Sequence, residues 1–572
     1  MNFSADIKKL PRHFLPEDFA ILNWDSLAPY FSNLEERAIG SVTELEQWLK
    51  DASELEAVIS EDACWRQIRM TCDTENKELE ESFNFFMMEI QPKIQPYADK
   101  LNRKLVECPF TNELDKEKYF TYLRNVKKNI DLFREENIAI MAELNVMQQQ
   151  FGMISGKMTV EVNGQEYTLQ QAAKFLEDAD RNLRESVYRK ISERRLQDKA
   201  ALNELFSALL EKRHQVALNA GFSNFRDYRF QELGRFDYTK EDCYQFHEAV
   251  KLHVMPLVNQ LYAAKKQKLG LSELRPWDIE AEPAGTKPLR PFQTGAELTE
   301  KTIRCFNTMQ PFFGDCLAKM REMGRLDLES RKGKAPGGYN CPLAETGAPF
   351  IFMNAAGTLD DVTTMVHEGG HAIHSFLSHE LELNGFKEYP TEIAEVASMS
   401  MELFSMDHWQ VFFTDKEELR RAKEQQLERV ITIFPWIATI DKFQHWIYEN
   451  PVHTADQRAQ QWLEILKEFS SPEIDFSGLD EYRLYSWHRQ LHLFEVPFYY
   501  IEYGIAQLGA IGLWKQYNQN PEKAVHNYVS ALSLGGTKTL PELFKSAGLP
   551  FDFSPSAIKE LMEFVKTELD KL

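Results

Sequence analysis

Two histidines that stand four residues apart form the most informative chemical pattern in the chain. His367 and His371 enclose Glu368 in the pentapeptide His-Glu-Gly-Gly-His. Residues four apart lie on the same face of a helix, so that both imidazoles can reach one zinc ion. Glu368 is rotated by about 100° from His367 around the helix axis, which puts its carboxylate where a general base for zinc-activated water must stand. The pattern predicts a zinc hydrolase site.

The residues around this motif are typical of a helix. Thr358 and Asp361 form a Thr-x-x-Asp capping box, and apolar residues continue beyond it at helical spacing. The adjacent Gly369 and Gly370 each cost about 1 kcal/mol relative to alanine in a helix, so an interaction outside the helix must favour them. One explanation is the close approach of another backbone or of substrate on the helix face that carries the histidines. The other is tight packing of the helix without any ligand.

A catalytic zinc site needs a third protein ligand and leaves one position open for water. Glutamates follow the motif within a few helical turns, at Glu388, Glu392, Glu395 and Glu402. Several of them share one face of a helix expected to begin near Pro390, so that one can bind metal while a neighbour orients a histidine. Spacing alone does not choose between them.

Three segments of the chain resemble the zinc peptidases of the thimet oligopeptidase and oligoendopeptidase F family. They are residues 361–374 around the motif, residues 395–399 and residues 492–504. The second segment implies that Glu395 is the third ligand, because the family carries its glutamate at that place. Glu402 stands where the family commonly has an acidic residue, which implies a role beside the ligands. The spacing within the third segment resembles the oligoendopeptidase F branch.

The same resemblance assigns transition-state roles within the third segment. In the family, a histidine and tyrosines from this region hydrogen-bond the substrate carbonyl as its oxygen becomes negative, and these roles fall to His492, Tyr500 and Tyr503. Positioned donors around an oxyanion typically contribute on the order of 3 kcal/mol each. Without the resemblance, two tyrosines three residues apart are typical of an aromatic core stripe.

Helical periodicity dominates the chain and predicts a mainly α fold. The periodic segments are residues 75–108, 117–151, 169–220, 240–269 and 298–323. A β-hairpin is expected at residues 157–169, because Asn163-Gly164 separates two alternating runs in the manner of a type I′ turn. A short strand is expected at residues 349–354, before the motif helix, and an extended peptide substrate could pair with it.

The hairpin and a proline-rich connection at residues 274–292 interrupt the helical pattern. These breaks favour an N-terminal helical lobe of residues 1–195 and a catalytic domain of residues 196–572, which carries the motif and the distal His/Tyr segment. The resemblance implies a two-lobed helical metallopeptidase with a deep central substrate channel and a small β-sheet near the motif helix. Such a channel would admit short oligopeptides and exclude folded proteins.

Composition narrows the function classes further. A chain of 572 residues with 43% apolar content can bury a substantial core. The net charge of −22 repels phosphate backbones, so we expect no nucleic-acid partner. We also expect no membrane span and no secretory signal. Seven scattered cysteines are typical of reduced thiols in a cytoplasmic protein.

Motif and resemblance together predict a zinc metalloendopeptidase that hydrolyses internal bonds of short oligopeptides. One Zn²⁺ per chain would be held by His367, His371 and Glu395, with Glu368 as the general base. Two alternatives stay open. One is a zinc metallocarboxypeptidase, because an all-α family of these also joins HExxH to a later glutamate, and the other is a non-catalytic peptide-binding scaffold. Cleavage preference and oligomeric state do not follow from the sequence.

Overall fold

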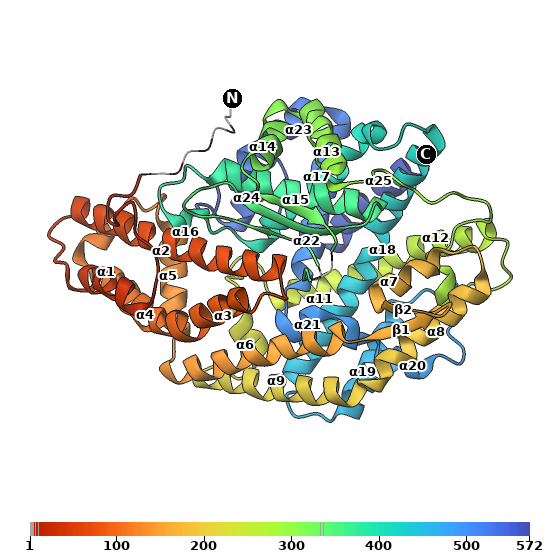
Figure 1. Ribbon diagram of the computed structural model, residues 1–572, viewed down its shortest axis with the longest axis horizontal. Coiled ribbons are helices and arrows are strands. Elements are labelled where there is room, and N and C mark those ends of the chain that lie inside the picture. Colours follow the sequence, from red (N-terminus) through yellow and green to blue (C-terminus); the bar gives the residue numbers. More distant parts are fainter. Residues whose placement is uncertain (1–4, 6, 8, 10, 332, 336) are drawn as a thin grey trace. The chain divides into compact units, whose positions relative to one another are not determined.

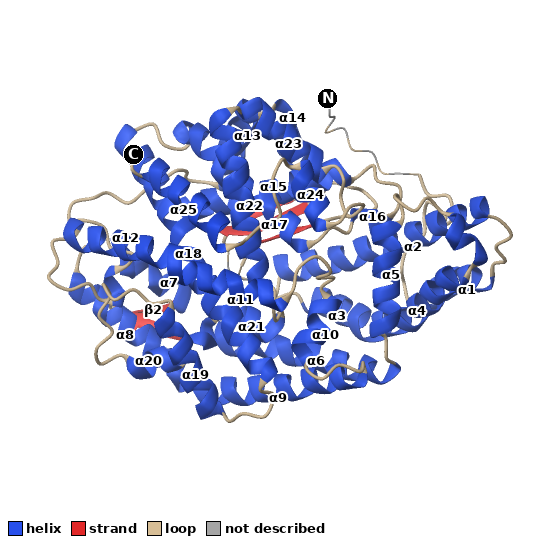
Figure 2. Cartoon of the chain, turned by 180° about the vertical axis from the view of Figure 1, so that it is seen from behind, coloured by secondary structure: helices blue, strands red, loops and turns tan. Residues whose placement is uncertain are grey.

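The computed structural model describes residues 5, 7, 9, 11–331, 333–335 and 337–572 of the chain. Helices make up most of this part, as Figures 1 and 2 show, which confirms the predicted mainly α fold. The chain forms two compact units: unit 1 with residues 1–133, 289–423 and 505–551, and unit 2 with residues 134–288, 424–504 and 552–572. Unit 2 includes residues on both sides of position 195, and the lobe boundary expected there stays a prediction.

Unit 1 combines an N-terminal group of helices with the elements that carry the zinc motif. Its helices are α1 (Trp24–Glu36), α2 (Val42–Cys72), α3 (Lys77–Phe85), α4 (Gln91–Glu107), α5 (Phe120–Leu132), α13 (Gly295–Met309), α14 (Pro311–Glu322), α15 (Leu359–Ser378), α16 (Asn384–Lys387), α17 (Thr391–Ser405), α23 (Pro521–Leu532) and α24 (Leu540–Ser546). Its strands are β3 (Leu326–Glu329), β4 (Tyr339–Cys341) and β5 (Phe350–Ala355).

Unit 2 carries the distal His/Tyr segment. Its helices are α6 (Glu135–Gly156), α7 (Leu169–Ala173), α8 (Arg181–Gln197), α9 (Lys199–Asn219), α10 (Phe225–Glu232), α11 (Lys240–Ala249), α12 (Met255–Lys268), α19 (Ala455–Glu468), α20 (Asp480–Leu484), α21 (Leu491–Glu495) and α25 (Pro555–Leu569). The helices α18 (Lys416–Glu449) and α22 (Tyr500–Gln519) contribute residues to both units. Within the described residues, no helix has the length and apolar character needed to cross a membrane.

The helix α2 shows how the sequence builds the core of the N-terminal group. Ser41 caps it by accepting a hydrogen bond from the backbone N–H of Glu44 at 3.2 Å. Its buried residues recur three or four positions apart, at Leu45, Trp48, Leu49, Ala52 and Leu55. This stripe packs with residues of α1 and α4 in one hydrophobic cluster, because helical periodicity places all five side chains on one face.

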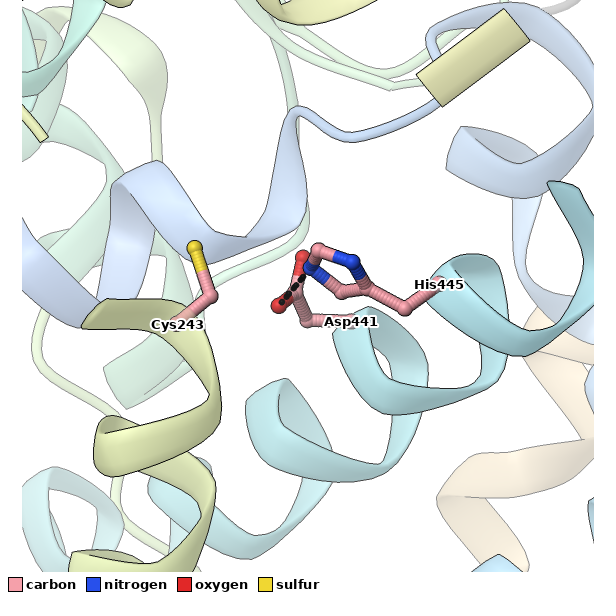
Figure 3. Close-up of side chains that lie close together, drawn as sticks. All are labelled: Cys243, Asp441 and His445. Carbon is pink, nitrogen blue, oxygen red and sulfur yellow. Dashed lines mark ion pairs between the residues drawn. The ribbon is translucent and has the colours of Figure 1, made fainter. Parts of the chain in front are cut away.

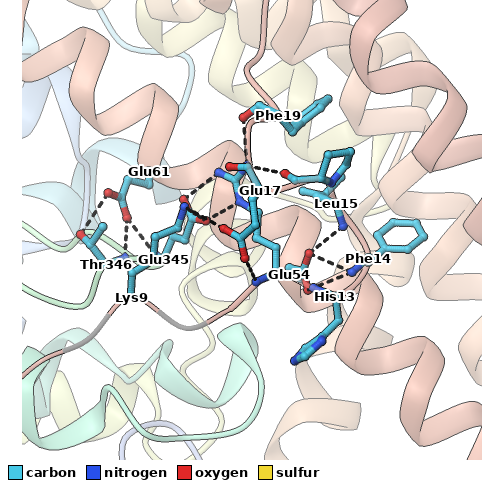
Figure 4. A network of polar contacts seen from close by, with 12 residues as sticks. Lys9, His13, Phe14, Leu15, Glu17, Phe19, Glu54, Glu61, Glu345 and Thr346 are labelled. Carbon is cyan, nitrogen blue, oxygen red and sulfur yellow. Dashed lines mark hydrogen bonds and ion pairs between the residues drawn. The ribbon is translucent and has the colours of Figure 1, made fainter.

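Carboxylates of unit 1 hold the segment that precedes α1 (Figure 4). Glu54 of α2 accepts hydrogen bonds from three successive backbone N–H groups, those of His13, Phe14 and Leu15. Glu345 forms an ion pair with Arg12 at 2.6 Å. Glu61 of α2 accepts hydrogen bonds from the backbone N–H groups of Glu345 and Thr346 at 2.9 and 2.8 Å. Segments far apart in the sequence are therefore joined through α2.

The predicted hairpin is present in unit 2. The strands β1 (Thr159–Val162) and β2 (Gln165–Thr168) pair antiparallel, with Val162 opposite Gln165. The turn residues Asn163 and Gly164 have φ angles of 53° and 80°. Positive φ at both central residues is the signature of a type I′ turn, which the Asn-Gly pair favours. The sequence prediction for this turn is confirmed.

A three-stranded sheet precedes the motif helix, as predicted, but its topology corrects the expected mode of substrate binding. The strand β5 lies in the centre, with Ile351 opposite Leu326 of parallel β3 and opposite Asn340 of antiparallel β4. The expectation that substrate pairs with this strand is wrong for residues 350–352. Both sides of β5 are already hydrogen-bonded within the sheet, so an incoming peptide finds no open edge there.

The helices α15 and α17 pack unusually closely, and Gly370 is the reason. A Cβ atom at Gly370 would lie 2.6 Å from the carbonyl oxygen of Ala397 and 2.6 Å from Cα of Ser398. A Cβ atom at Gly369 would meet the ring of Phe306 at 2.7 Å. The glycine pair is therefore explained by packing of α15 against the backbone of α17 and against α13. The same packing brings Glu395 close to the two histidines of α15, because Glu395 lies on α17.

Alanine at Gly370 should lower the free energy of unfolding by about 1 to 3 kcal/mol, because the added methyl group overlaps backbone atoms that cannot turn aside. The matched control is Gly152→Ala in α6, where a Cβ meets nothing within 4 Å. That variant should be neutral or more stable by up to about 1 kcal/mol. Midpoints of urea denaturation compare the two. A Gly370→Ala protein as stable as the wild type would contradict the packing argument.

Candidate metal centre

The helix α15 begins where the sequence predicts. The hydroxyl of Thr358 accepts a hydrogen bond from the backbone N–H of Asp361 at 3.3 Å, and the Asp361 carboxylate accepts one from the backbone N–H of Thr358 at 2.8 Å. Its apolar face is fully buried at Val362, Met365, Val366 and Ile373. With this face anchored, the side chains of His367 and His371 stay about one fifth exposed, at 20% and 18%.

Both imidazoles lie against one carboxylate oxygen. The Nε2 atom of His367 is 3.4 Å from Oε2 of Glu395, and Nε2 of His371 is 3.8 Å from the same oxygen. Candidate ligand atoms of the three residues all lie within 4.8 Å of one another. Zinc bonds of about 2.0 to 2.2 Å in a tetrahedral arrangement hold nitrogen and oxygen ligands roughly 3.4 Å apart. This donor set fits a zinc ion.

Two further side chains hold the ligands in place. Nδ1 of His367 lies 2.7 Å from Oε1 of Glu402, which directs the other ring nitrogen, Nε2, towards Glu395. The hydroxyl of Ser398 donates a hydrogen bond of 3.0 Å to Oε2 of Glu395. Histidine ligands of zinc commonly make such a second hydrogen bond to a carboxylate, which fixes the orientation of the ring. The arrangement of Glu402 and His367 follows this pattern.

The electrostatics of the two histidines differ. Burial opposes the charged form of His367, but the carboxylates of Glu395 and Glu402 outweigh it and raise the pKa of His367 well above its usual value. The two carboxylates therefore favour a positive charge at this position, which a bound metal ion would also supply. Burial lowers the pKa of His371 to about 4, against an opposing effect of Glu395. His371 is thus a neutral imidazole, the form that binds metal.

Glu368 lies on α15 outside the group of three candidate ligands. Its side chain is buried, with 6% exposed, and its Oε2 atom has no hydrogen-bond partner within the described part of the chain. Burial raises the pKa of Glu368 to about 7. A carboxylate with an unsatisfied oxygen and a pKa near neutrality is suited to accept and return a proton.

The distal residues form a separate cluster in unit 2. His492 lies on α21, and Tyr500 and Tyr503 lie on α22. The ring centroid of His492 is 4.9 Å from that of Tyr500 and 5.9 Å from that of Tyr503, and the tyrosine rings are 5.4 Å apart. Burial raises the pKa of Tyr500, which keeps its hydroxyl protonated as a hydrogen-bond donor. The structure brings all three predicted residues together.

The sequence reasoning missed two residues that orient this chemistry. Ser398 stands three positions after Glu395 on α17, so helical spacing was a signal that could have found it. The amide Nε2 of Gln490 lies 2.6 Å from Nδ1 of His492, and Gln490 also accepts a hydrogen bond from Trp436 at 2.9 Å. Nothing in the local sequence marks Gln490, because its partner Trp436 comes from α18.

Comparison with known proteins finds two family patterns along the chain, and the site residues lie within one of them. The pattern of Peptidase family M3 matches residues 174–563, which include the motif, Glu395 and the His492 cluster. The pattern of the Peptidase M3 N-terminal domain matches residues 14–133.

Individual relatives agree with these matches. An oligoendopeptidase F homolog of Borreliella burgdorferi is 22% identical over 461 residues, which are 77% of this chain and 75% of that protein. The plasmid oligoendopeptidase F of Lactococcus lactis subsp. cremoris is 25% identical over 65% of this chain and 64% of that protein. The solved structure of PZ peptidase A with an inhibitor is 26% identical, superposes with a TM-score of 0.90, and covers 98% of this chain and 99% of its own.

Replacing Glu395 by alanine should abolish stoichiometric zinc binding at the motif, because it removes one of three candidate ligands. Glu392→Ala is the matched control on the same helix, since Glu392 is also buried but is not among the three residues whose ligand atoms converge. Metal analysis of the purified variants provides the measurement. A zinc content equal to that of the wild type in Glu395→Ala, together with one zinc ion fewer per chain in Glu392→Ala, would move the third ligand.

Replacing Glu402 by glutamine should weaken zinc affinity by about 10- to 100-fold without abolishing binding, the usual range for a partner of a metal-bound histidine. The reason is that a neutral amide holds Nδ1 of His367 less firmly than the carboxylate at 2.7 Å. Competition with a chelator measures the affinity. Unchanged affinity would show that the contact between Glu402 and His367 does not support the metal.

Proposed function

The chain belongs to Peptidase family M3, and we propose that it is a zinc metalloendopeptidase that hydrolyses internal bonds of short oligopeptides. The observation that carries the proposal is the convergence of His367 Nε2 and His371 Nε2 on one oxygen of Glu395, at 3.4 and 3.8 Å. These three residues would hold the metal. When bound there, zinc polarises the scissile carbonyl and makes water more acidic.

Glu368 is assigned the role of general base. It would take a proton from the attacking water and return it to the nitrogen of the leaving amine. Its buried position and its Oε2 atom support this role, because no residue of the described part of the chain forms a hydrogen bond with that oxygen. A pKa raised to about 7 by burial suits both halves of the proton transfer.

The cluster of His492, Tyr500 and Tyr503 is assigned to stabilisation of the oxyanion. Imidazole N–H and phenol O–H groups are suitable donors, and donors held in advance at the right place contribute most. The contact of Gln490 with Nδ1 of His492 supports this assignment, because it fixes the orientation of the ring. Burial keeps the Tyr500 hydroxyl protonated by raising its pKa.

The proposed substrates and location rest on the relatives and on the cysteines. Two curated relatives are named oligoendopeptidase F, which favours cleavage of peptides rather than of folded proteins. We place the protein in the cytoplasm, since all seven of its cysteines, each of them described, are thiols rather than disulfides. One catalytic zinc ion per chain is proposed.

Glu368→Gln should retain the motif zinc but lose at least about a hundredfold in kcat, because an amide cannot accept the proton from water. Glu380→Gln is the control, an exposed glutamate just beyond the end of α15. Metal content and peptide turnover are measured on the same preparations. A metal-loaded Glu368→Gln enzyme with wild-type turnover would exclude Glu368 as the base.

Peptides blocked at both ends separate the proposed endopeptidase from a carboxypeptidase. An endopeptidase should cleave internal bonds of a peptide with acetylated and amidated ends, whereas an obligate carboxypeptidase requires a free carboxylate. Mass spectrometry of the products maps the cleaved bonds. Release of single C-terminal residues, and only from unblocked peptides, would favour the carboxypeptidase alternative. No chelator-sensitive cleavage of any peptide would favour the non-catalytic scaffold.

A further inference from the structure

A second group of metal-binding residue types lies in unit 2, which does not contain the His-Glu-Gly-Gly-His motif. Cys243 comes from α11, and Asp441 and His445 come from α18. Their candidate ligand atoms are a thiol sulfur, a carboxylate oxygen and a ring nitrogen, and all lie within 4.8 Å of one another. Figure 3 shows Asp441 and His445 turned towards each other, with Cys243 beside them on the neighbouring helix.

Two pairs of residues with metal-binding side chains lie on the helices α11 and α18. Cys243 and His247 stand four residues apart on α11, and Asp441 and His445 stand four residues apart on α18. The two pairs meet, because Nε2 of His247 lies 2.8 Å from Oδ2 of Asp441. Nε2 of His445 lies 3.3 Å from the same oxygen, without hydrogen-bond geometry. That separation resembles the 3.4 Å between His367 and Glu395.

The group is completely buried. The exposed fractions of Cys243 and Asp441 are 0%, and those of His247 and His445 are 2%. Aromatic rings surround His445, with centroids at 4.9 to 5.8 Å, from Tyr244, Phe498 and Phe230. An ionised carboxylate is costly in such apolar surroundings unless a cation or several hydrogen bonds compensate it.

The hydrogen bond with His247 and the ion pair with His445 both involve Oδ2 of Asp441, so neither contact satisfies Oδ1. Oδ1 of Asp441 and Nε2 of His445 are buried and have no hydrogen-bond partner within the described residues. Buried polar atoms are almost always satisfied, so that unsatisfied ones point to a partner such as an ion. A purely structural Asp–His hydrogen-bond network explains the contact of His247 with Oδ2. It leaves Oδ1 of Asp441 and Nδ1 of His445 unexplained, since neither has a hydrogen-bond partner within the described residues.

We propose that Cys243, Asp441 and His445 bind a divalent transition-metal ion of the zinc class, which joins α11 to α18 as a structural site. Thiolate, imidazole and carboxylate are the ligand types of zinc, whereas magnesium and calcium prefer oxygen donors alone. His247 orients the carboxylate through Oδ2, as partners of metal ligands do. Complete burial of the ligands fits a structural site rather than a catalytic one, which must admit substrate, and an ion held here would take a fourth ligand beside these three.

Cobalt(II) titration of the metal-free wild-type protein tests the site directly. A thiolate bound to cobalt(II) gives a charge-transfer band in the near ultraviolet, and the candidate ligands at the motif include no thiol. The band should be present in the wild type and in the control Cys316→Ser, a buried cysteine of unit 1, and absent in Cys243→Ser. A wild-type protein without the band, or a band that survives in Cys243→Ser, overturns the proposal.

His445→Gln keeps the thiol and provides a second variant if Cys243→Ser does not fold. It should shift the cobalt titration of the band to at least tenfold higher concentration, because about tenfold is already the smallest loss expected when a group that only orients a ligand is removed. An unshifted titration counts against His445 as a ligand and overturns the proposed set.

Zinc analysis in the Glu395→Ala background separates this site from the catalytic one. The single variant should keep one zinc ion per chain and gain thermal stability on zinc addition, because a metal that binds the folded state stabilises it. The double variant Glu395→Ala/Cys243→Ser should contain no stoichiometric zinc and should gain no thermal stability on zinc addition. Equal zinc content and equal response to zinc in the two variants overturn the proposal, whatever their peptidase activity.

Discussion

The close approach of α15 and α17 at Gly370 is the constraint on which the rest of the metal centre depends. The missing side chain lets α15 pack against the backbone of Ala397 and Ser398. Because Glu395 and Ser398 lie on that stretch of α17, the same contact brings a carboxylate and its hydrogen-bond donor against the two histidines. Glu402 lies about two turns further along α17 and reaches His367 from its other side.

Negative charge held at fixed distance is what makes this arrangement suited to a cation. The oxygen of Glu395 lies too far from the two Nε2 atoms for good hydrogen bonds, but at the separation of ligands around one ion. Glu402 adds a second carboxylate on the far side of His367. Glu368 stands on the same helix without joining the ligands and keeps one oxygen unsatisfied. In the proposed mechanism, metal binding by His367 and His371 and proton transfer by Glu368 are divided between neighbouring residues of one helix.

The group at Cys243 follows similar geometry with different helices. In unit 1 a pair of histidines on α15 meets a carboxylate on α17, and in unit 2 Cys243 on α11 meets Asp441 and His445 on α18. The main difference between the two groups is how far solvent reaches their side chains. His367 and His371 are about one fifth exposed, whereas the unit 2 residues are buried. Exposure suits a site that must admit water and substrate, and burial suits one that joins helices.

Features that depend on neighbouring residues were determined by the sequence alone. The capping box of Thr358 and Asp361, the shared face of His367 and His371, and the type I′ turn at Asn163-Gly164 all involve residues at most four positions apart. Short separations leave few conformations open, so residue type and spacing are sufficient. Helical periodicity runs across residues 298–323, but Pro311 divides this stretch into α13 and α14, because proline cannot continue the first helix.

Tertiary structure decided which distant residues meet. Several glutamates follow the motif, and the packing of α17, not their spacing, puts Glu395 and Glu402 against the histidines. Packing also decided three other features: the central position of β5, the contact of Gln490 with Trp436, and the proximity of Cys243 to Asp441. Each depends on long-range packing of side chains and backbone, which local periodicity does not specify because many pairings of the same helices preserve it.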